Sequence, residues 1–307
     1  DGRYRLDLGA APRATLSCFV IAYGGEAVTS TMDLDEAGGR WDIALSSRAA
    51  SLSGRVLDGL GAPVAGLRAT TRGAASAEAL VQRGVSAVSL EQDPDANRQA
   101  VADAEIIVLG VKPYQILEVL TDLVEHARPE ATVVSVAAGI TLASMEDIWP
   151  GALVRAMPNT PAQVGRGVTG LARGSRTSDT QAAMVEALFS TVGEVLVVKE
   201  DQINALSSIS GSGPAYVYLF IEHFMEVARQ KGFTEHQARV MVEGTFSGAL
   251  AVLAQSDKTP EQLQVEVTSP GGSTAAALQA FEDADLEAIF AAASDAAIAR
   301  AEEMSRE

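Results

Sequence analysis

Short apolar, β-branched runs alternate with segments of helical spacing between residues 40 and 199. The runs at 104–111, 131–137, 152–156 and 194–198 each predict a buried strand. Between the first two, apolar residues at 116, 117, 120, 123 and 124 follow the period of a helix that Pro113 would open. Alternating strands and helices predict parallel strands joined by right-handed crossovers, and therefore an open α/β sheet.

After Glu200 the strand pattern stops and only helical signals follow. Four helices are expected: Pro214 to Lys231 with Gly232 as the stop, Thr234 to about Gln255 with a capping box, a short one from Thr259, and a last one from Asp285 to Met304. The sequence thus predicts an α/β domain at 41–199, an all-α domain at 200–307, and an atypical segment at 1–40. The apolar surface of the helical half predicts burial against a second subunit.

Three expected strands end in small or kinked segments. These are Val111-Lys112-Pro113, Ala137-Ala138-Gly139 and Met157 to Pro161. Because ligands of open α/β sheets bind outside the carboxyl ends of the strands, the three exits together favour a cofactor cleft. Each exit alone is also compatible with an ordinary loop.

Two further segments combine glycine with hydroxyl side chains. Ser269 to Thr274 lies between helices, and its glycines and the following helix start suit a bound carboxylate. An ordinary interhelical turn with a hydroxyl cap fits the same segment about equally well. The segment 207–218 runs from a Ser/Gly turn into Pro214, for which a helix N-cap is the simpler explanation.

Composition and charge exclude several classes of partner. The formal net charge of −17 over 307 residues argues against nucleic-acid binding, which needs clustered Lys and Arg. The single cysteine, Cys18, excludes an intramolecular disulfide and a thiolate zinc site, and no metal site is expected. No apolar run is long enough for a membrane span, and no signal peptide is recognised, so we expect a cytoplasmic protein.

Five motifs together resemble those of the Δ1-pyrroline-5-carboxylate reductase family. They are VKP at 111–113, AAGI at 137–140, MPNTP at 157–161, SGSGPAYVY at 210–218 and VTSPGGST at 267–274, and they occur in the family's order. The resemblance runs from about residue 52 to the C-terminus. It implies a Rossmann-type domain followed by an all-α dimerisation domain, a homo-oligomer of at least two subunits, and reduction of pyrroline-5-carboxylate to L-proline by hydride from NAD(P)H.

The resemblance also implies roles for individual residues. Ser269, Gly271 and Gly272 would hold the substrate carboxylate, and Thr274 would hydrogen-bond near the ring nitrogen as the catalytic candidate. The cofactor would be lined by Val111, Lys112, Pro113, Ala138 and Gly139, with Asn97 on its ribose side.

The residues after the expected second strand, 67–70, bear on the choice of cofactor. An NAD site would place an acidic residue there, whereas Thr71 and Arg72 offer a hydroxyl and a guanidinium to a 2′-phosphate. NADPH is therefore favoured, with NADH as the alternative and a plain surface arginine as the simpler explanation.

The start of the chain departs from the family. The first strand and glycine loop should fall near 43–54, where Leu52, Gly54, Leu57 and Leu60 suit the following helix and Gly54 takes the place of the third glycine. Arg48 and Ala50 stand in place of the first two. Further upstream, 18–23 is strand-like.

Two explanations remain open. Residues 1–50 are a non-native translation product, or they are a divergent N-terminus with an impaired cofactor site. The functional alternatives are a catalytically impaired dimeric homologue, or a reductase of the same fold acting on another small imino or keto acid.

Overall fold

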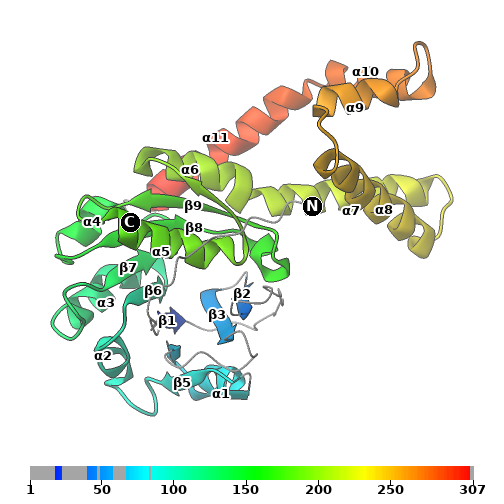
Figure 1. The fold of residues 1–307 in the computed structure, drawn as a ribbon. Coiled ribbons are helices and arrows are strands. Elements are labelled where there is room, and N and C mark those ends of the chain that lie inside the picture. The colour runs from blue at the N-terminus through cyan, green and yellow to red at the C-terminus, as the bar shows by residue number, and fades with distance from the viewer. Residues whose placement is uncertain (1–17, 23–39, 47–48, 58–66, 83, 305–307) are drawn as a thin grey trace. The chain divides into compact units, whose positions relative to one another are not determined.

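The computed structural model describes residues 18–22, 40–46, 49–57, 67–82 and 84–304 (Figure 1). The chain divides into two compact units, one of residues 1–211 with 301–307 and the other of residues 212–300. We call them the sheet unit and the helical unit. The expected domain boundary at residue 199 lies shortly before the end of the sheet unit's main segment.

The described part of the sheet unit contains an eight-stranded sheet and a two-stranded hairpin. The strand order in the large sheet is β10-β9-β8-β7-β6-β1-β4-β5. The strands are β1 (Cys18–Ala22), β2 (Arg40–Ser46), β3 (Ala49–Leu57), β4 (Arg68–Thr71), β5 (Ser86–Ser89), β6 (Ile106–Gly110), β7 (Thr132–Ser135), β8 (Leu153–Met157), β9 (Gly167–Arg173) and β10 (Gly193–Val197).

Helices cover both faces of this sheet. The α-helices of the sheet unit are α1 (Ala74–Gln82), α2 (Ala96–Val101), α3 (Ile116–Leu123), α4 (Leu142–Glu146), α5 (Asp179–Ser190) and α6 (Ile203–Leu206). Short 3₁₀ segments are η1 (Pro113–Gln115), η2 (Thr160–Val164) and η3 (Glu200–Gln202), and a π-helical turn, η4, spans Ser207–Gly211.

Alternate residues of the central strands supply two separate cores. In β6, Ile107 and Leu109 pack with apolar side chains of α3, α4 and α6, whereas Ile106 and Val108 pack with those of α5. All four side chains are fully buried. This alternation is the period-2 geometry of a strand covered on both sides. It explains why the continuous apolar run correctly predicted a central strand.

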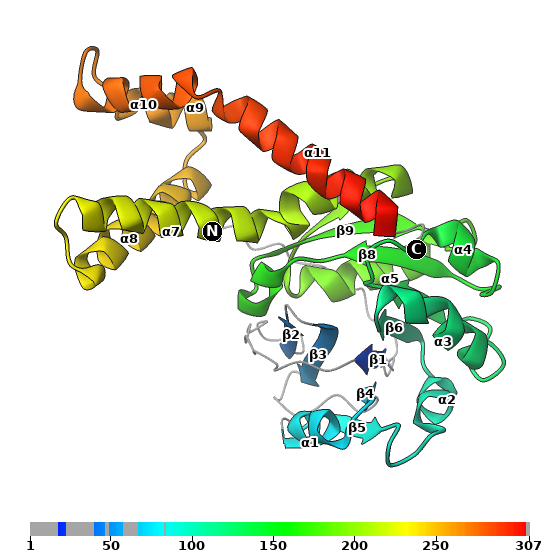
Figure 2. The same cartoon turned by 180° about the vertical axis from the view of Figure 1, so that it is seen from behind.

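The open α/β sheet departs from the expected parallel pairing at one position. β8 and β9 pair antiparallel, and β10 then runs parallel to β9, whereas the pairs β6·β7 and β7·β8 are parallel. Figure 2 shows β8 and β9 lying side by side in the sheet. Only nine residues separate Met157 from Gly167 in the chain, and a parallel return requires a connection of a dozen or more.

The expected first strand and its helix are also placed differently. β1, in the strand-like run near Cys18, lies between β4 and β6 and pairs parallel to both. Residues 49–57 form β3, antiparallel to β2, so the helix expected around Leu52 is wrong. Gly54 pairs with Ile43 in this hairpin and does not begin a helix behind a glycine loop. Arg48 lies outside the described residues.

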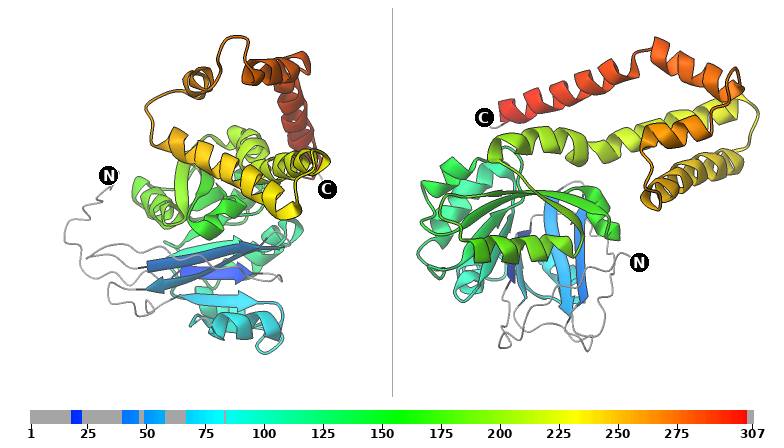
Figure 3. Two further views of the ribbon diagram at one scale, coloured as in Figure 1. Left: turned by 90° about the vertical axis from the view of Figure 1, so that its right-hand side faces the viewer. Right: turned by 45° about the horizontal axis from the view of Figure 1, so that its top comes forward.

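Four helices of the helical unit follow the expected boundaries closely, and α10 (Ser273–Asp283) is an additional helix that was not among the four expected. The four are α7 (Gly213–Gln230), α8 (Glu235–Ala254), α9 (Pro260–Glu266) and α11 (Leu286–Met304), the last of which ends in the sheet unit's C-terminal segment. Gly232 has a φ of +92°, the left-handed conformation that ends a helix, and Thr234 and Gln237 form the predicted capping box of α8. Figure 3 shows α7 and α8 as a helical hairpin.

Candidate active site

The exits of β6, β7 and β8 lie next to one another at one edge of the sheet. The three strands are neighbours and run in the same direction, so their carboxyl ends share that edge. The segments beginning at Val111, at Val136 and at Pro158 follow them directly. The structure therefore brings together the three exits that the sequence singled out as a cofactor cleft.

Backbone and small side chains dominate the first two exits. Val111 is buried, while Lys112 and Pro113 are half-buried and lead into η1. Ala138 is half-buried, and Gly139 is buried with a φ of +80°, a conformation that a residue with a Cβ adopts only with strain. These exits can present main-chain groups at short range to a flat, polar ligand.

One polar atom at this edge lacks a partner. Oε1 of Gln115, in η1, is buried, and no hydrogen-bond donor reaches it within the described structure. Leaving such an acceptor unpaired costs about 1–3 kcal/mol. A ligand that donates an N–H or O–H group at the β6 exit would satisfy it. The residues present therefore fit a nicotinamide dinucleotide, which carries ribose hydroxyls and a carboxamide.

The residues at the end of β4 have different roles. Thr71 is buried and its hydroxyl donates to the Gly73 carbonyl oxygen over 2.9 Å, so it shapes the turn. Arg72 is exposed. The Ala74 N–H, at the start of α1, donates to Oε2 of Glu91 over 3.1 Å. The carboxylate of Glu91 thus lies at the positive end of α1, and that helix starts two residues after Arg72.

Asn97, in α2, contacts β4. It is 7% exposed, and its Oδ1 accepts from the Thr70 hydroxyl over 2.5 Å. The side chain that the resemblance assigns to the ribose side of the cofactor therefore has a second role, in fixing α2 to β4.

An ion pair with a buried cation lies behind the β8 exit. The guanidinium of Arg155, whose side chain is 5% exposed, lies 3.4 Å from Oε1 of Glu200. The same carboxylate oxygen accepts from the Leu142 N–H at the start of α4. Burial lowers the pKa of Arg155, and the attraction of Glu200 opposes that effect. The pair joins η3 to β8 and to the segment after Gly139.

Two of the five motifs meet at this edge. Asn159 Nδ2 donates to the Ser210 carbonyl oxygen over 2.9 Å, and a Cβ on Gly211 would lie 3.5 Å from Cε of Met157. MPNTP and the start of SGSGP are thus in contact although about fifty residues separate them. Sequence reasoning assigned no role to Asn159, Arg155 or Glu200, because nothing local in the sequence marks partners so far apart.

The candidate substrate loop belongs to the helical unit. Ser269 is exposed, Gly271 is exposed with a φ of +70°, and the Gly272 N–H donates to the Ser269 carbonyl oxygen over 3.0 Å. Gly272 is the N-cap of α10, and Thr274 is exposed in its first turn. The loop therefore turns tightly and presents the free N–H groups of a helix start, the geometry that binds a carboxylate.

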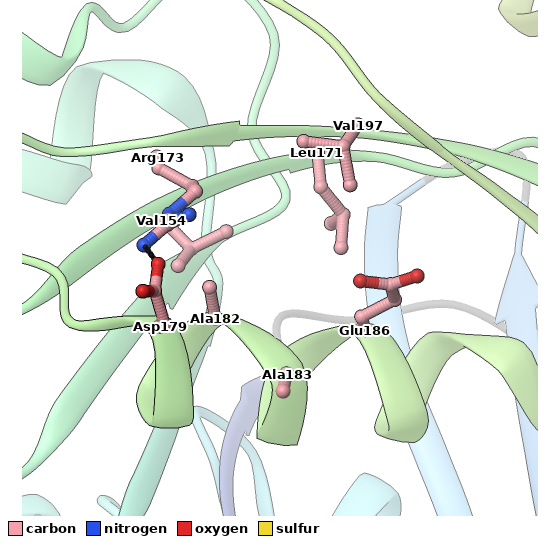
Figure 4. A pocket seen from close by; sticks show the side chains of 8 residues that line it. All are labelled: Val154, Leu171, Arg173, Asp179, Ala182, Ala183, Glu186 and Val197. Carbon is pink, nitrogen blue, oxygen red and sulfur yellow. Dashed lines mark hydrogen bonds and ion pairs between the residues drawn. The ribbon is translucent and has the colours of Figure 1, made fainter.

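A separate pocket lies on the α5 side of the sheet (Figure 4). Its floor comes from β8, β9 and β10 and its wall from α5, and the Arg173–Asp179 ion pair, at 2.7 Å, closes one end. It is lined by Val154, Leu171, Arg173, Asp179, Ala182, Ala183, Glu186 and Val197. None of the residues predicted to bind cofactor or substrate lines this pocket.

Within the described part of the chain, no helix is long and apolar enough to cross a membrane.

Two family descriptions match two separate parts of the chain. Residues 59–139 match "NADP oxidoreductase coenzyme F420-dependent", and residues 200–304 match "Pyrroline-5-carboxylate reductase dimerisation". The first range contains the exits of β4, β6 and β7. The second contains the candidate substrate loop.

Relatives span both ranges. A pyrroline-5-carboxylate reductase of Pseudomonas aeruginosa is 35% identical over 269 residues, which are 86% of this chain and 96% of that protein. A solved structure of a pyrroline-5-carboxylate reductase from Coxiella burnetii is 35% identical with a TM-score of 0.71, over 78% of this chain and 88% of that one. A Plasmodium falciparum pyrroline carboxylate reductase, solved with NADP bound, is 26% identical with a TM-score of 0.68, over 78% and 87%. By its sequence, its fold and the order of its motifs, the chain belongs to the pyrroline-5-carboxylate reductase family.

Proposed function

We propose that the protein reduces Δ1-pyrroline-5-carboxylate to L-proline with hydride from NADPH, the last step of proline biosynthesis. The observation that carries the proposal is the 35% identity across nearly the whole length of a pyrroline-5-carboxylate reductase. The adjacent exits of β6, β7 and β8 support a dinucleotide site of the kind that this reaction needs.

The cofactor would be held along the carboxyl edge of the sheet. It would be lined by Val111, Lys112, Pro113, Ala138 and Gly139. Asn97 would lie on the ribose side and Arg72 at the 2′-phosphate. Thr71 would support Arg72 by fixing the turn. A bound reduced nicotinamide supplies the hydride. Gly54 lies in strand β3 and does not open a helix behind a phosphate loop.

The substrate would be held through its carboxylate. The Gly271 N–H, the N–H groups of the first turn of α10 and the Ser269 hydroxyl are suited to a carboxylate, with Gly272 as the N-cap that shapes the turn. The hydroxyl of Thr274, the second residue of α10, would hydrogen-bond the ring nitrogen. The chemistry asked of these residues is orientation, since holding two reactants in the reactive geometry supplies about 7–11 kcal/mol of barrier reduction. The imine is then expected to arrive protonated, or to take its proton through water or Thr274.

We also propose a homodimer formed through residues 200–307, a substrate domain with that boundary, and a cytoplasmic location. The helical unit supports the dimer, because many of its large apolar side chains are exposed, among them Phe224, Val240, Leu250, Phe281 and Ile289.

The direct test follows NADPH oxidation at 340 nm with and without Δ1-pyrroline-5-carboxylate. We expect oxidation that depends on the imine, and none with a simple 2-keto acid in its place. Binding of NADPH is measured beside it by fluorescence. Binding without turnover would favour a reductase of another small imino or keto acid. Absence of both would favour the catalytically impaired dimeric homologue.

A further inference from the structure

Asn159 links three segments that are far apart in the chain. Its Nδ2 donates to the Ser210 carbonyl oxygen over 2.9 Å, and its Oδ1 accepts from the Val168 N–H over 2.8 Å. The residue is 8% exposed. Both ends of the amide are therefore used, and the exit of β8 is joined to the start of β9 and to η4.

The link to β9 extends the sheet beyond its last backbone pair. Met157 pairs with Gly170 at the end of the β8·β9 ladder. Two residues farther on, the Asn159 side chain supplies the acceptor that a backbone carbonyl would supply in a longer strand. This fixes the side chain at the carboxyl edge of β8, next to the exits that contain Val111 and Gly139.

The link to η4 holds a turn of unusual geometry. In a π-helical turn the hydrogen bonds skip one residue more than in an α-helix, and such turns are frequent at functional sites. The Ser210 hydroxyl donates to the Leu206 carbonyl oxygen over 3.0 Å, while the Ser210 carbonyl oxygen accepts from Asn159. A Cβ on Gly211 would lie only 2.8 Å from Oγ of Ser207, so the turn is also tightly packed.

We propose that Asn159 is a positioning residue for imine reduction. Its amide holds η4 against the carboxyl edge of the sheet and so fixes the point at which the chain leaves the sheet unit for α7, which starts at Gly213. Asn159 acts on the reaction through this backbone and touches neither the reacting carbon nor the hydride. The proposal rests on the reductase function proposed above.

The informative variant is Asn159→Asp. It keeps the size of the side chain and the oxygen that accepts from the Val168 N–H, but replaces the donor to Ser210 with a carboxylate oxygen. We expect kcat to fall by about 10²-fold at alkaline pH, as for a misplacement of about 1 Å. The NADPH Kd and the KM for the imine should change little.

The pH profile of this variant separates positioning from packing. Burial and the nearby carbonyl raise the pKa of a carboxyl group at this position above its ordinary value. Below that pKa the group is neutral and its O–H can again donate to the Ser210 oxygen. The ratio of the variant's kcat to that of the wild type should therefore rise as the pH falls.

The control is Thr177→Val. The Thr177 hydroxyl donates to the Leu153 carbonyl oxygen over 2.6 Å and accepts from the Leu153 N–H over 3.1 Å, so this variant loses two buried hydrogen bonds at the opposite end of β8. Its kcat should stay near that of the wild type even if its unfolding midpoint falls. An equal loss of kcat in both variants would overturn the proposal.

Hydrogen exchange tests the same idea without turnover. Amides of residues 207–213 should exchange faster in Asn159→Asp than in the wild type or in Thr177→Val. Unchanged exchange there would overturn the proposal. A wild-type chain that fails to oxidise NADPH would defeat the reductase function alone, because the exchange experiment would still decide whether Asn159 holds η4.

Discussion

The guanidinium of Arg155 and the carboxylate of Glu200 form an unequal pair. The Arg155 side chain is 5% exposed and that of Glu200 is 32% exposed. Removing the carboxylate leaves a buried cation without its counter-charge, whereas removing the cation leaves a carboxylate that water can still reach. The two halves of one ion pair should therefore differ in their effect on stability.

Unfolding in urea measures this difference. Glu200→Gln should lower the free energy of unfolding by about 2–4 kcal/mol, and Arg155→Met by less than half of that. Equal losses, or a larger loss for Arg155→Met, would contradict the assignment of Arg155 as the costly charge.

Arg72 and Glu91 should act on cofactor choice in opposite directions. Arg72→Ala removes the cation proposed for the 2′-phosphate and should weaken NADPH binding by about tenfold, with little effect on NADH. Glu91→Gln removes the carboxylate at the start of α1 and should tighten NADPH binding relative to NADH, because like charges repel. Fluorescence titration with both cofactors measures the two ratios. Unchanged NADPH affinity in Arg72→Ala would count against this subsite.

Thr274 is the hydroxyl proposed to contact the imine nitrogen. Thr274→Ala should lower kcat/KM for the imine by about tenfold to a hundredfold, the value of one hydrogen bond to a charged group. Thr274→Ser keeps the hydroxyl and should recover most of that loss. Steady-state kinetics at saturating NADPH provides the measurement, and a wild-type rate in Thr274→Ala would exclude Thr274 from the site.

At the scale of elements, signals carried by neighbouring residues were predictive. The glycine stop at Gly232, the capping box at Thr234 and the proline at 260 gave the bounds of α7 and α8 and the start of α9 within a few residues, and continuous apolar runs gave β6, β7 and β10. β9 was missed because Gly167 and Gly170 break its apolar pattern. Its direction was nevertheless encoded in the short connection from β8. The segment around Leu52 was misassigned because both a period of two and a helical period fit so few residues.

The residues of the candidate site also fall into those that the sequence predicted and those that it did not. Positions at strand ends, such as Val111 and Gly139, could be predicted because topology alone puts them at one edge. The roles of Asn159 and Glu200 could not, since they depend on tertiary contacts with residues about fifty positions away.

The start of β9 and β10 depends on one glycine. Gly193 has a φ of +145°, and a Cβ there would collide with the backbone of Gly167, its partner in the β9·β10 ladder. Gly193→Ala should lower the free energy of unfolding by at least about 3 kcal/mol through strain and displacement of the strand. Gly73→Ala is the control, because its Cβ would meet only ordinary contacts. Similar unfolding midpoints in urea for the two variants would contradict this account.

For the whole molecule, the decisive property is assembly. Leu250 in α8 is 63% exposed and Val81 in α1 is 54% exposed. If the helical unit forms the dimer, Leu250→Asp should shift the protein toward monomer, whereas Val81→Asp should leave it dimeric. Light scattering at micromolar concentration distinguishes the two. A monomeric wild type would contradict the dimer altogether.

The order of strands along one half of the sheet has a consequence for how the chain is made. From β7 to β10, each strand pairs with the strand synthesised just before it. Such local pairing costs little loop-closure entropy, so this half can assemble strand by strand as it leaves the ribosome. β1 instead must wait until both β4 and β6 have emerged. The half that contains Asn159 and the exits of β6 to β8 is thus a folding module held together by its own local pairings, and β6 is the strand through which it pairs with β1.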